Sequence, residues 1–472
     1  MKERSDIAVI GLGVMGAGIA RNLESKGYTV SLYNRSEEKL AAFLNQFGEG
    51  NFRAAADLQE LCGQLDAPRK VLMMVKAGEA VDETLQAVLP FLEPGDVLID
   101  GGNSYYGDTE RRMMLAESAG VLYVGCGISG GEEGALKGPA IMPGGSGGAK
   151  ELVMPILLDI CARTDLGEAC CSWMGSGGAG HFVKMVHNGI EYAEMQILCE
   201  IWDLMRHTLG MDHAMCGRTF ARWAQKNPSY LLETASRVLL KQEADGSFLV
   251  ERILDAAEQK GTGAWTVRTG MEMGVPLSIL SEAVQARSLS AGKEEREAAA
   301  EKYGRKGYTG EVIGAERRFA MLQSLQEALK AARILAFSQG FALLKTASDR
   351  FGWDLNLGEV ALCWRSGCIL RSSLLEDIKQ SYVYDKNLPN LMLSNVMHHA
   401  LMESLPGLKT VCMTALENGI PAPCLTAALQ YFNGQTSSQL PANLLQGMRD
   451  LFGAHTYERT DAPRGEHFHT EW

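Results

Sequence analysis

The feature that most constrains the fold of this chain is a glycine-rich turn near its N-terminus, Gly11-Leu12-Gly13-Val14-Met15-Gly16. The turn follows the apolar run IAVIG, which is typical of a buried strand, and it opens a helical pattern near Ala17 to Ser25. Glycine-rich turns also occur for packing reasons. In this context, however, the G-x-G-x-x-G spacing lets the backbone approach a pyrophosphate that the helix N-terminus attracts. The motif therefore predicts a dinucleotide-binding unit.

Strand-like and helix-like segments continue to alternate up to about residue 180, as in TVSLYN, a helix near Glu37 to Phe47, KVLMMV and DVLIDGG. Alternation of this kind predicts a parallel α/β sheet domain over residues 1–180. Helical spacing of apolar residues then dominates, for example over 181–209, 316–338 and 401–417. We expect an all-helical domain over 181–439. The residues 440–472 form a short helix and a polar tail, for which a frayed terminus is the simplest interpretation.

Composition excludes several classes of function. The net charge of -12 argues against nucleic-acid or anionic-membrane partners, which usually require a basic surface. The 11 cysteines contain no C-x-x-C pair, so we expect no metal site and reduced thiols in the cytoplasm. Lys2 and Arg4 before an apolar stretch imitate a secretory signal, but the glycines within that stretch favour a strand and a turn.

The end of the second predicted strand, Tyr33-Asn34-Arg35-Ser36, bears on the choice of dinucleotide. An NAD site usually has an acidic residue about 20 residues after the glycine turn, where it accepts from the ribose hydroxyls. No carboxylate stands here, and Arg35 can hold a 2′-phosphate. The sequence therefore favours NADP over NAD.

Two further segments are expected to line the same edge of the sheet. Met74-Val75-Lys76-Ala77-Gly78 and Asp100-Gly101-Gly102-Asn103-Ser104 follow apolar strands, and ligands bind at the carboxyl ends of parallel strands. A glycine-rich loop is expected from Gly127 to Gly134, continuing to Gly145. Its glycines would let backbone donors approach an oxygen-rich ligand.

The segment GSGGAGHFVKMVHNGIEYAEMQ, residues 175–196, combines a glycine-rich entry with a helix that has an unusual polar face. At about 100° per residue, five polar side chains fall within roughly 140° of arc: Lys184, His187, Asn188, Glu191 and Tyr192. Such a face is more often a solvated surface stabilised by i,i+4 pairs. Apolar residues on the other sides instead indicate a buried helix whose polar face lines a cavity: Phe182, Met185, Val186, Ile190 and Met195.

In this order, the motifs GxGxxG, VKAG, DGGNS, SGGEEGA, GPxxMPGG and HFVKMVHNGIEY resemble the 6-phosphogluconate dehydrogenase family. The resemblance continues through KGTGAWT, ARSLS, FSQGFALL, WRxGCIxR, LPANL and RDLFGAHTYER, and so covers essentially the whole chain. It implies a Rossmann-like N-terminal domain, a large all-α domain, and a C-terminal tail that reaches the partner subunit of a homodimer. The frayed-terminus interpretation is then the weaker one.

The resemblance implies oxidation of 6-phosphogluconate with NADP, loss of carbon dioxide and formation of ribulose 5-phosphate, without a metal. It assigns Lys184 as the base that takes the hydroxyl proton. It assigns Glu191 as the acid that protonates carbon one of the enediol.

The remaining site residues implied by the resemblance fall into three groups. The cofactor would contact Gly11, Leu12, Gly13, Val14, Met15, Gly16, Asn34, Arg35, Ser36, Val75, Lys76, Ala77 and Asn103. The carboxylate and hydroxyls of the substrate would contact Asn103, Ser129, Gly130, Gly131, His187 and Asn188. Its phosphate would contact Tyr192, Lys260, Thr262 and Arg287, together with Arg449 and His455 of the neighbouring subunit.

The sequence departs from the family pattern at a few positions. Gly13 stands where the family often has alanine, a form shared with shorter NAD-linked 3-hydroxyacid dehydrogenases. Ser366 replaces an expected glycine, and residues 431–436 and the GMRD motif also differ. Two alternatives remain open: an NAD-dependent 3-hydroxyacid dehydrogenase, which would lack the tail, and a non-catalytic NADPH-binding protein, which would have lost Lys184 or Glu191.

Overall fold

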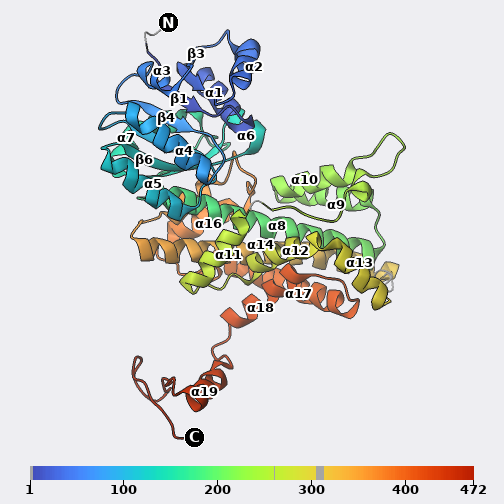
Figure 1. Cartoon of the computed structure of the whole chain (residues 1–472). Coiled ribbons are helices and arrows are strands. Elements are labelled where there is room, and N and C mark those ends of the chain that lie inside the picture. The colour runs from blue at the N-terminus through green and yellow to red at the C-terminus, as the bar shows by residue number, and fades with distance from the viewer. Residues whose placement is uncertain (1–3, 260, 305–312) are drawn as a thin grey trace. The chain divides into compact units, whose positions relative to one another are not determined.

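The computed structural model describes residues 4–259, 261–304 and 313–472 (Figure 1). Two compact units are present, residues 1–428 and residues 429–472, and each is described by itself. The first unit contains a sheet with its covering helices and, packed against them, a layer of long helices (Figure 1).

In the described ranges, the sheet has seven strands in the order β3-β2-β1-β4-β5-β6-β7. Their bounds are β1 Ile7–Ile10, β2 Val30–Tyr33, β3 Phe52–Ala54, β4 Lys70–Met73, β5 Val97–Asp100, β6 Leu122–Ser129 and β7 Ala140–Gly145. All neighbours are parallel except β6 and β7, which are antiparallel. The strand order reverses between β1 and β4. Open α/β sheets bind ligands in the crevice at such a reversal, outside the carboxyl ends of the strands.

Both faces of the sheet are buried, which explains why its strands are almost continuously apolar. Ile7 and Val9 of β1 pack on one face with helices α1, α2 and α7, whereas Ala8 and Ile10 pack on the other with α3, α4 and α5. These helices, with α6, have the bounds α1 Val14–Ser25, α2 Glu37–Phe47, α3 Leu58–Gly63, α4 Glu79–Val88, α5 Tyr106–Ser118, α6 Gly131–Lys137 and α7 Lys150–Ile160.

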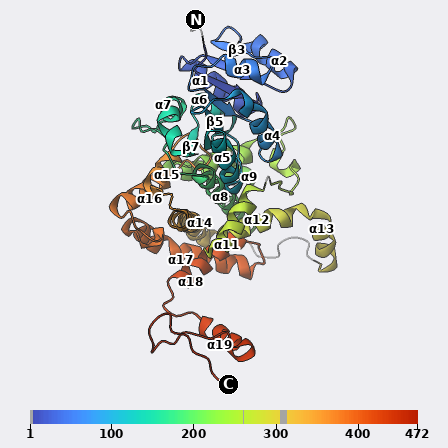
Figure 2. The same ribbon diagram turned by 60° about the vertical axis from the view of Figure 1, so that its left-hand side comes forward.

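The rest of the first unit is helical, as the spacing of apolar residues predicts. The bounds are α8 Ala179–Leu209, α9 His213–Lys226, α10 Tyr230–Leu240, α11 Thr262–Met273, α12 Ser278–Ala291, α13 Lys293–Lys302, α14 Ala315–Phe351, α15 Leu357–Cys363, α16 Leu374–Tyr384, α17 Asn395–Glu417 and α18 Pro423–Gln435, which continues into the second unit. Helix α8 contacts the sheet through β6 and β7, and it also packs against α11, α12 and α14. The long helices α14 and α17 lie side by side (Figures 1 and 2). Helix α8 thus joins the sheet to the helical layer.

The second unit contains α19, Ala442–Gly453, and an ordered tail folded around one carboxylate. The buried side chain of Asp450 accepts hydrogen bonds from the backbone N–H groups of Thr456 and Thr470, each at 3.0 Å. Trp472 Nε1 donates to it at 3.0 Å, and His469 Nδ1 lies 2.9 Å away. Burial raises the pKa of Asp450, but these hydrogen bonds outweigh it and lower the pKa to about 2. The frayed-terminus interpretation of this segment is therefore wrong.

The expected glycine-rich loop over 127–145 is a second correction. Gly127 to Ser129 are the last residues of β6, residues 131–137 form α6, and residues 140–145 form β7. High glycine content suggested a loop because glycine is usually rare inside strands. Here Gly127 of β6 and Gly144 of β7 are required because α8 lies directly against the two strands.

Candidate functional site

The glycine turn between β1 and α1 has the geometry that its spacing predicts. Gly11 has a φ of +96°, and a Cβ atom there would lie 2.7 Å from the carbonyl oxygen of Met74. A Cβ on Gly16 would lie 1.9 Å from the carbonyl oxygen of Gly11. At the start of α1, a Cβ on Gly13 would meet nothing within 4 Å, and Val14 is 63% exposed. The turn therefore leaves open space over a helix N-terminus, which fits a pyrophosphate.

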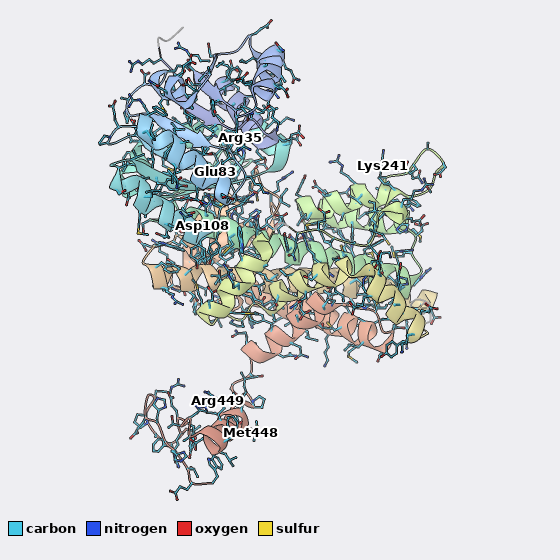
Figure 3. All side chains as sticks on the ribbon, viewed as in Figure 1. Arg35, Glu83, Asp108, Lys241, Met448 and Arg449 are labelled. Atoms are coloured by element: carbon cyan, nitrogen blue, oxygen red, sulfur yellow. The ribbon has the colours of Figure 1, made fainter. Side chains whose placement is uncertain are left out.

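Of the residues that follow β2, Asn34 has a structural role and Arg35 is exposed to solvent. Asn34 Oδ1 accepts from the Leu12 N–H at 2.9 Å, and Asn34 Nδ2 donates to the Ser36 carbonyl at 2.9 Å. Its side chain thus braces the glycine turn. Arg35 is free to meet a ligand, since its side chain is 92% exposed. It lies 3.9 Å from Glu83 Oε2 of α4, an acid that the sequence prediction did not consider (Figure 3).

The loops after β4 and β5 are tied together by a buried arginine on α5, Arg112. Its NH2 group donates to the Gly78 carbonyl at 2.9 Å, and its NH1 group donates to Ser104 Oγ at 3.2 Å. A bidentate pair with Asp82 completes its contacts on α4. Lys76 and Asn103, the polar residues expected to face the cofactor, are both exposed on these loops.

The last residue of β5 connects the same loops to α8. Asp100 accepts from the Gly102 N–H at 3.0 Å and from Ser104 Oγ at 2.6 Å, and its carbonyl lies 3.1 Å from His181 Nε2. His181 lies one helical turn before Lys184. The buried network therefore fixes the start of α8 relative to the cofactor loops.

Glycines allow α8 to lie very close to the sheet. A Cβ on Gly127 of β6 would lie 2.5 Å from the Cβ of Lys184, and a Cβ on Gly180 would lie 2.2 Å from the carbonyl oxygen of Gly125. Any larger residue at these positions would displace the helix or its side chains. The glycines of β6 thus determine where Lys184 lies.

The polar face of α8 forms one contiguous cluster, as the spacing predicts. His187 Nδ1 lies 3.5 Å from Lys184 Nζ, 3.2 Å from Asn188 Oδ1 and 3.7 Å from Glu191 Oε2. Lys184, His187 and Asn188 are buried, and the side chain of Glu191 is 21% exposed. Met195, expected among the apolar cover, is instead 40% exposed.

Burial shifts the pKa values of this cluster toward the neutral forms. It lowers the pKa of Lys184, against an opposing effect of Glu191, and it lowers the pKa of His187 well below the usual range. It raises the pKa of Glu191, against Lys184 and Arg287. A neutral amine and a protonated carboxyl are the forms needed for a general base and a general acid.

Two buried polar atoms, Ser129 Oγ at the end of β6 and His187 Nε2 on α8, have no hydrogen-bond partner among the described residues. Buried polar groups are rarely left unpaired, so a ligand with hydroxyl or carboxylate oxygens fits here. Gly130 follows with a φ of +129°, and a Cβ there would lie 2.6 Å from the carbonyl oxygen of Gly367. Gly131 has a φ of +63° and open space around it.

The residues expected to bind the phosphate are partly assembled in the first unit. The guanidinium of Arg287 lies 3.4 Å from the ring centroid of Tyr192, and Thr262 opens α11. A Cβ on Gly263 would lie 2.6 Å from the Tyr192 ring, so α11 begins directly against α8. Lys260 lies outside the described residues.

The two tail residues of the expected phosphate site belong to the second unit. Arg449 and His455 are both exposed, and Arg449 NH1 donates to Gln446 Oε1 at 3.0 Å. Neither forms an ion pair among the described residues of this chain, so both remain available to a ligand.

Sequence reasoning missed the wall formed by the segment 363–368. The ring of Trp364 contacts the edge of His187 at a centroid distance of 5.4 Å, and its Nε1 donates to Met142 Sδ at 3.2 Å. Cys368 is buried close enough to affect the pKa of Lys184. These residues lie more than 150 positions after the end of α8, and helical periodicity gives no signal for such a contact.

Within the ranges described, there is no cluster of three or more His, Cys, Asp or Glu side chains that could hold a metal ion. Over the same ranges, none of the helices combines the length and the apolar character needed to cross a membrane.

The doubly covered parallel sheet, its glycine turn and the buried lysine–carboxylate pair define a dinucleotide-dependent dehydrogenase. Residues 6–175 match the NAD binding domain of 6-phosphogluconate dehydrogenase, and residues 180–472 match the 6-phosphogluconate dehydrogenase C-terminal domain. The chain belongs to the decarboxylating 6-phosphogluconate dehydrogenase family.

Individual relatives are similar over their full length. The chain is 47% identical to the decarboxylating 6-phosphogluconate dehydrogenase of Treponema pallidum, over 99% of this chain and 97% of the relative. It is 45% identical to the NADP(+)-dependent, decarboxylating enzyme of Bacillus subtilis, over 100% and 99%. The 6-phosphogluconate dehydrogenase of Plasmodium falciparum has been solved in its apo form, in complex with its cofactor NADP+ and in complex with its substrate 6-phosphogluconate. This chain matches that structure with a TM-score of 0.95 and 38% identity, over 99% of this chain and 100% of that one.

Proposed function

We propose that this chain catalyses the oxidative decarboxylation of 6-phospho-D-gluconate to D-ribulose 5-phosphate and carbon dioxide, with NADP reduced to NADPH. This is a reaction of the pentose phosphate pathway, and we place the protein in the cytoplasm. Family membership supports the reaction, and the cofactor and substrate of the Plasmodium falciparum relative support the ligands. The observation that carries the proposal is the cluster of Lys184, His187 and Glu191 on one face of α8, together with the unpaired hydroxyl of Ser129 on β6.

The residues around the glycine turn fit NADP. The open N-terminus of α1 at Gly13 would receive the pyrophosphate, and the exposed Arg35 would receive the 2′-phosphate. The other proposed contacts come from the β2 end and the two following loops: Asn34, Ser36, Val75, Lys76, Ala77 and Asn103. Asn34 would act mainly through its backbone, because its side chain braces the turn. When bound, NADP supplies the hydride acceptor.

Lys184 is the proposed base. Its amine would take the proton of the 3-hydroxyl of the substrate as the hydride leaves carbon three. The protonated amine would then polarise the resulting keto oxygen while the carboxylate is lost as carbon dioxide. Burial favours the neutral amine, which the first of these steps requires.

Glu191 is the proposed acid. It lies two turns along the same face of α8, so the two groups address neighbouring carbons of one sugar acid. Its carboxyl would donate a proton to carbon one of the enediol left by decarboxylation. Burial raises its pKa and so keeps the proton available.

The remaining polar groups would orient the substrate. Its carboxylate and hydroxyls would contact Asn103, Ser129, Gly130, Gly131, His187 and Asn188. Its phosphate would contact Tyr192, Lys260, Thr262 and Arg287, with Arg449 and His455 supplied by the second subunit of a homodimer. Convergence of these cations would let a protein of net charge -12 bind a dianionic phosphate.

The test is an initial-rate assay of NADPH formation with 6-phosphogluconate, run in parallel with NAD and with trapping of the carbon dioxide. We expect NADPH and carbon dioxide in equal amounts and slow turnover with NAD. Reduction of the cofactor without carbon dioxide would instead support a non-decarboxylating 3-hydroxyacid dehydrogenase. No turnover despite NADPH binding would support a non-catalytic protein.

A further inference from the structure

In the structure, a carboxylate from another helix lies near the end of β2, where the sequence of β2 itself has no acid. The second strand ends in Asn34, Arg35 and Ser36, so the acid typical of an NAD site is missing from β2. Glu83, on the second turn of α4, extends toward Arg35 from the neighbouring element (Figure 3). The distance from Arg35 NH1 to Glu83 Oε2 is 3.9 Å.

Both members of this pair face solvent, at 92% and 61% side-chain exposure for Arg35 and Glu83. An exposed pair contributes little to the free energy of unfolding, so the pair is not explained by stability. The adjacent carboxylate, Asp82, is different. It accepts hydrogen bonds from Arg111 and Arg112, which offset its charge. Among the described carboxylates of α4, Glu83 is the one that lies within 4 Å of the Arg35 guanidinium.

A phosphate bound to Arg35 would lie within a few ångströms of the Glu83 carboxylate. Like charges at about 5 Å repel one another even in water, and the carboxylate must also release the guanidinium. A ribose with a free 2′-hydroxyl has no such conflict, because a hydroxyl can donate to a carboxylate. The same side chain thus disfavours NADP and tolerates NAD.

We propose that Glu83 is a specificity-determining residue that competes with the 2′-phosphate of NADP for Arg35, and so weakens the preference for NADP over NAD. The inference rests on the proposed function only in taking Arg35 as the 2′-phosphate site. Weaker binding of the 2′-phosphate also favours release of the reduced cofactor after each turnover.

The test compares Glu83→Gln with the wild type by calorimetric titration of NADP and of NAD. Glutamine keeps the size of the side chain and removes its charge. We expect the Kd for NADP to fall roughly three- to tenfold, the Kd for NAD to stay the same or rise, and the gain to shrink from about 0.05 M to about 0.5 M salt. Glu151→Gln, which removes an exposed carboxylate of α7, is the matched control and should change neither Kd. An unchanged or weaker affinity of Glu83→Gln for NADP would overturn the proposal.

The Arg35→Gln variant tests the proposed 2′-phosphate site separately from the role of Glu83. If the NADP site is assigned correctly, this variant loses affinity for NADP and not for NAD. Unchanged NADP binding in Arg35→Gln would remove the 2′-phosphate site and with it the basis for Glu83. If Arg35→Gln behaves as expected while Glu83→Gln binds NADP as the wild type does, only the role of Glu83 fails. In the double variant the gain from Glu83→Gln should nearly vanish, and an undiminished gain would contradict competition for Arg35.

Discussion

Lys184 and Glu191 lie on one face of α8, and burial changes their protonation in opposite senses. Loss of solvent disfavours any charged form, so the pKa of the lysine falls and the pKa of the glutamate rises. Each group partly opposes the shift of the other, because the charged pair would attract. His187 between them stays neutral for the same reason of burial. Burial therefore shifts the cluster toward one proton acceptor and one proton donor.

These directions predict a bell-shaped dependence of kcat on pH. Activity should rise as Lys184 loses its proton, because the base must be neutral, and fall as Glu191 loses its proton, because the acid must be protonated. Glu191→Gln should remove the falling limb and lower kcat by about 10²-fold or more. Glu297→Gln, an exposed acid of α13, should leave the profile unchanged. A falling limb that persists in Glu191→Gln would assign that limb to another group.

The sequence predicted the polar face of α8 because five side chains at helical spacing can be placed on one face without knowing the fold. It could not predict the wall formed by Trp364 and Cys368 against the same face. Their contact with α8 depends on how later helices return to it. The sequence also could not predict that Glu83 lies close to Arg35. This contact depends on how α4, which follows β4, is placed relative to the end of β2.

At the scale of elements, the fit between β6 and α8 determines the geometry of the site. The interpretation of residues 127–145 as a loop was wrong because it considered only the local preference of glycine for loops. It did not include the packing of α8 against β6 and β7. Within the sheet, a glycine at 127 leaves the space that the Lys184 side chain occupies. The alternation of strands and helices, by contrast, was predicted well, since buried parallel strands are continuously apolar.

Gly127→Ala should therefore lower kcat at least tenfold while the fold is retained. The added Cβ would lie 2.5 Å from the Lys184 Cβ, and such overpacking costs about 1–3 kcal/mol in the free energy of unfolding. Gly147→Ala is the matched control, because a Cβ there meets nothing within 4 Å. Thermal unfolding and kcat are measured for both variants. A destabilised Gly127→Ala enzyme with normal kcat would show that Gly127 serves packing alone.

At the scale of the whole molecule, the second unit presents more apolar surface than a free terminus normally does. Five side chains of α19 are between 50% and 71% exposed: Leu444, Leu445, Met448, Leu451 and Phe452. Contiguous apolar surface of this kind usually marks an interface. It supports the proposal that a second subunit receives the tail. The resemblance implied a structured tail, but its proposed destination is a second copy of the chain, which periodicity does not encode.

Mixed dimers test this sharing of the site. Lys184→Met and Arg449→Ala should each be nearly inactive as homodimers. After the two proteins are dissociated and reassociated together, mixed dimers contain one site with both residues intact, so about a quarter of wild-type activity should return. The recovered kcat is measured against each variant reassociated alone. No recovery would contradict the donation of Arg449 to the neighbouring site.

The most direct test of the proposed chemistry is a rapid-mixing measurement of NADPH formation and carbon dioxide release in the first turnover of the wild type, Lys184→Met and Glu191→Gln. If Lys184 is the base and Glu191 the later acid, Glu191→Gln forms about one NADPH and one carbon dioxide per site before turnover slows, whereas Lys184→Met shows no burst. A normal burst in Lys184→Met, or loss of the burst in Glu191→Gln without loss of NADP and substrate binding, would contradict these roles.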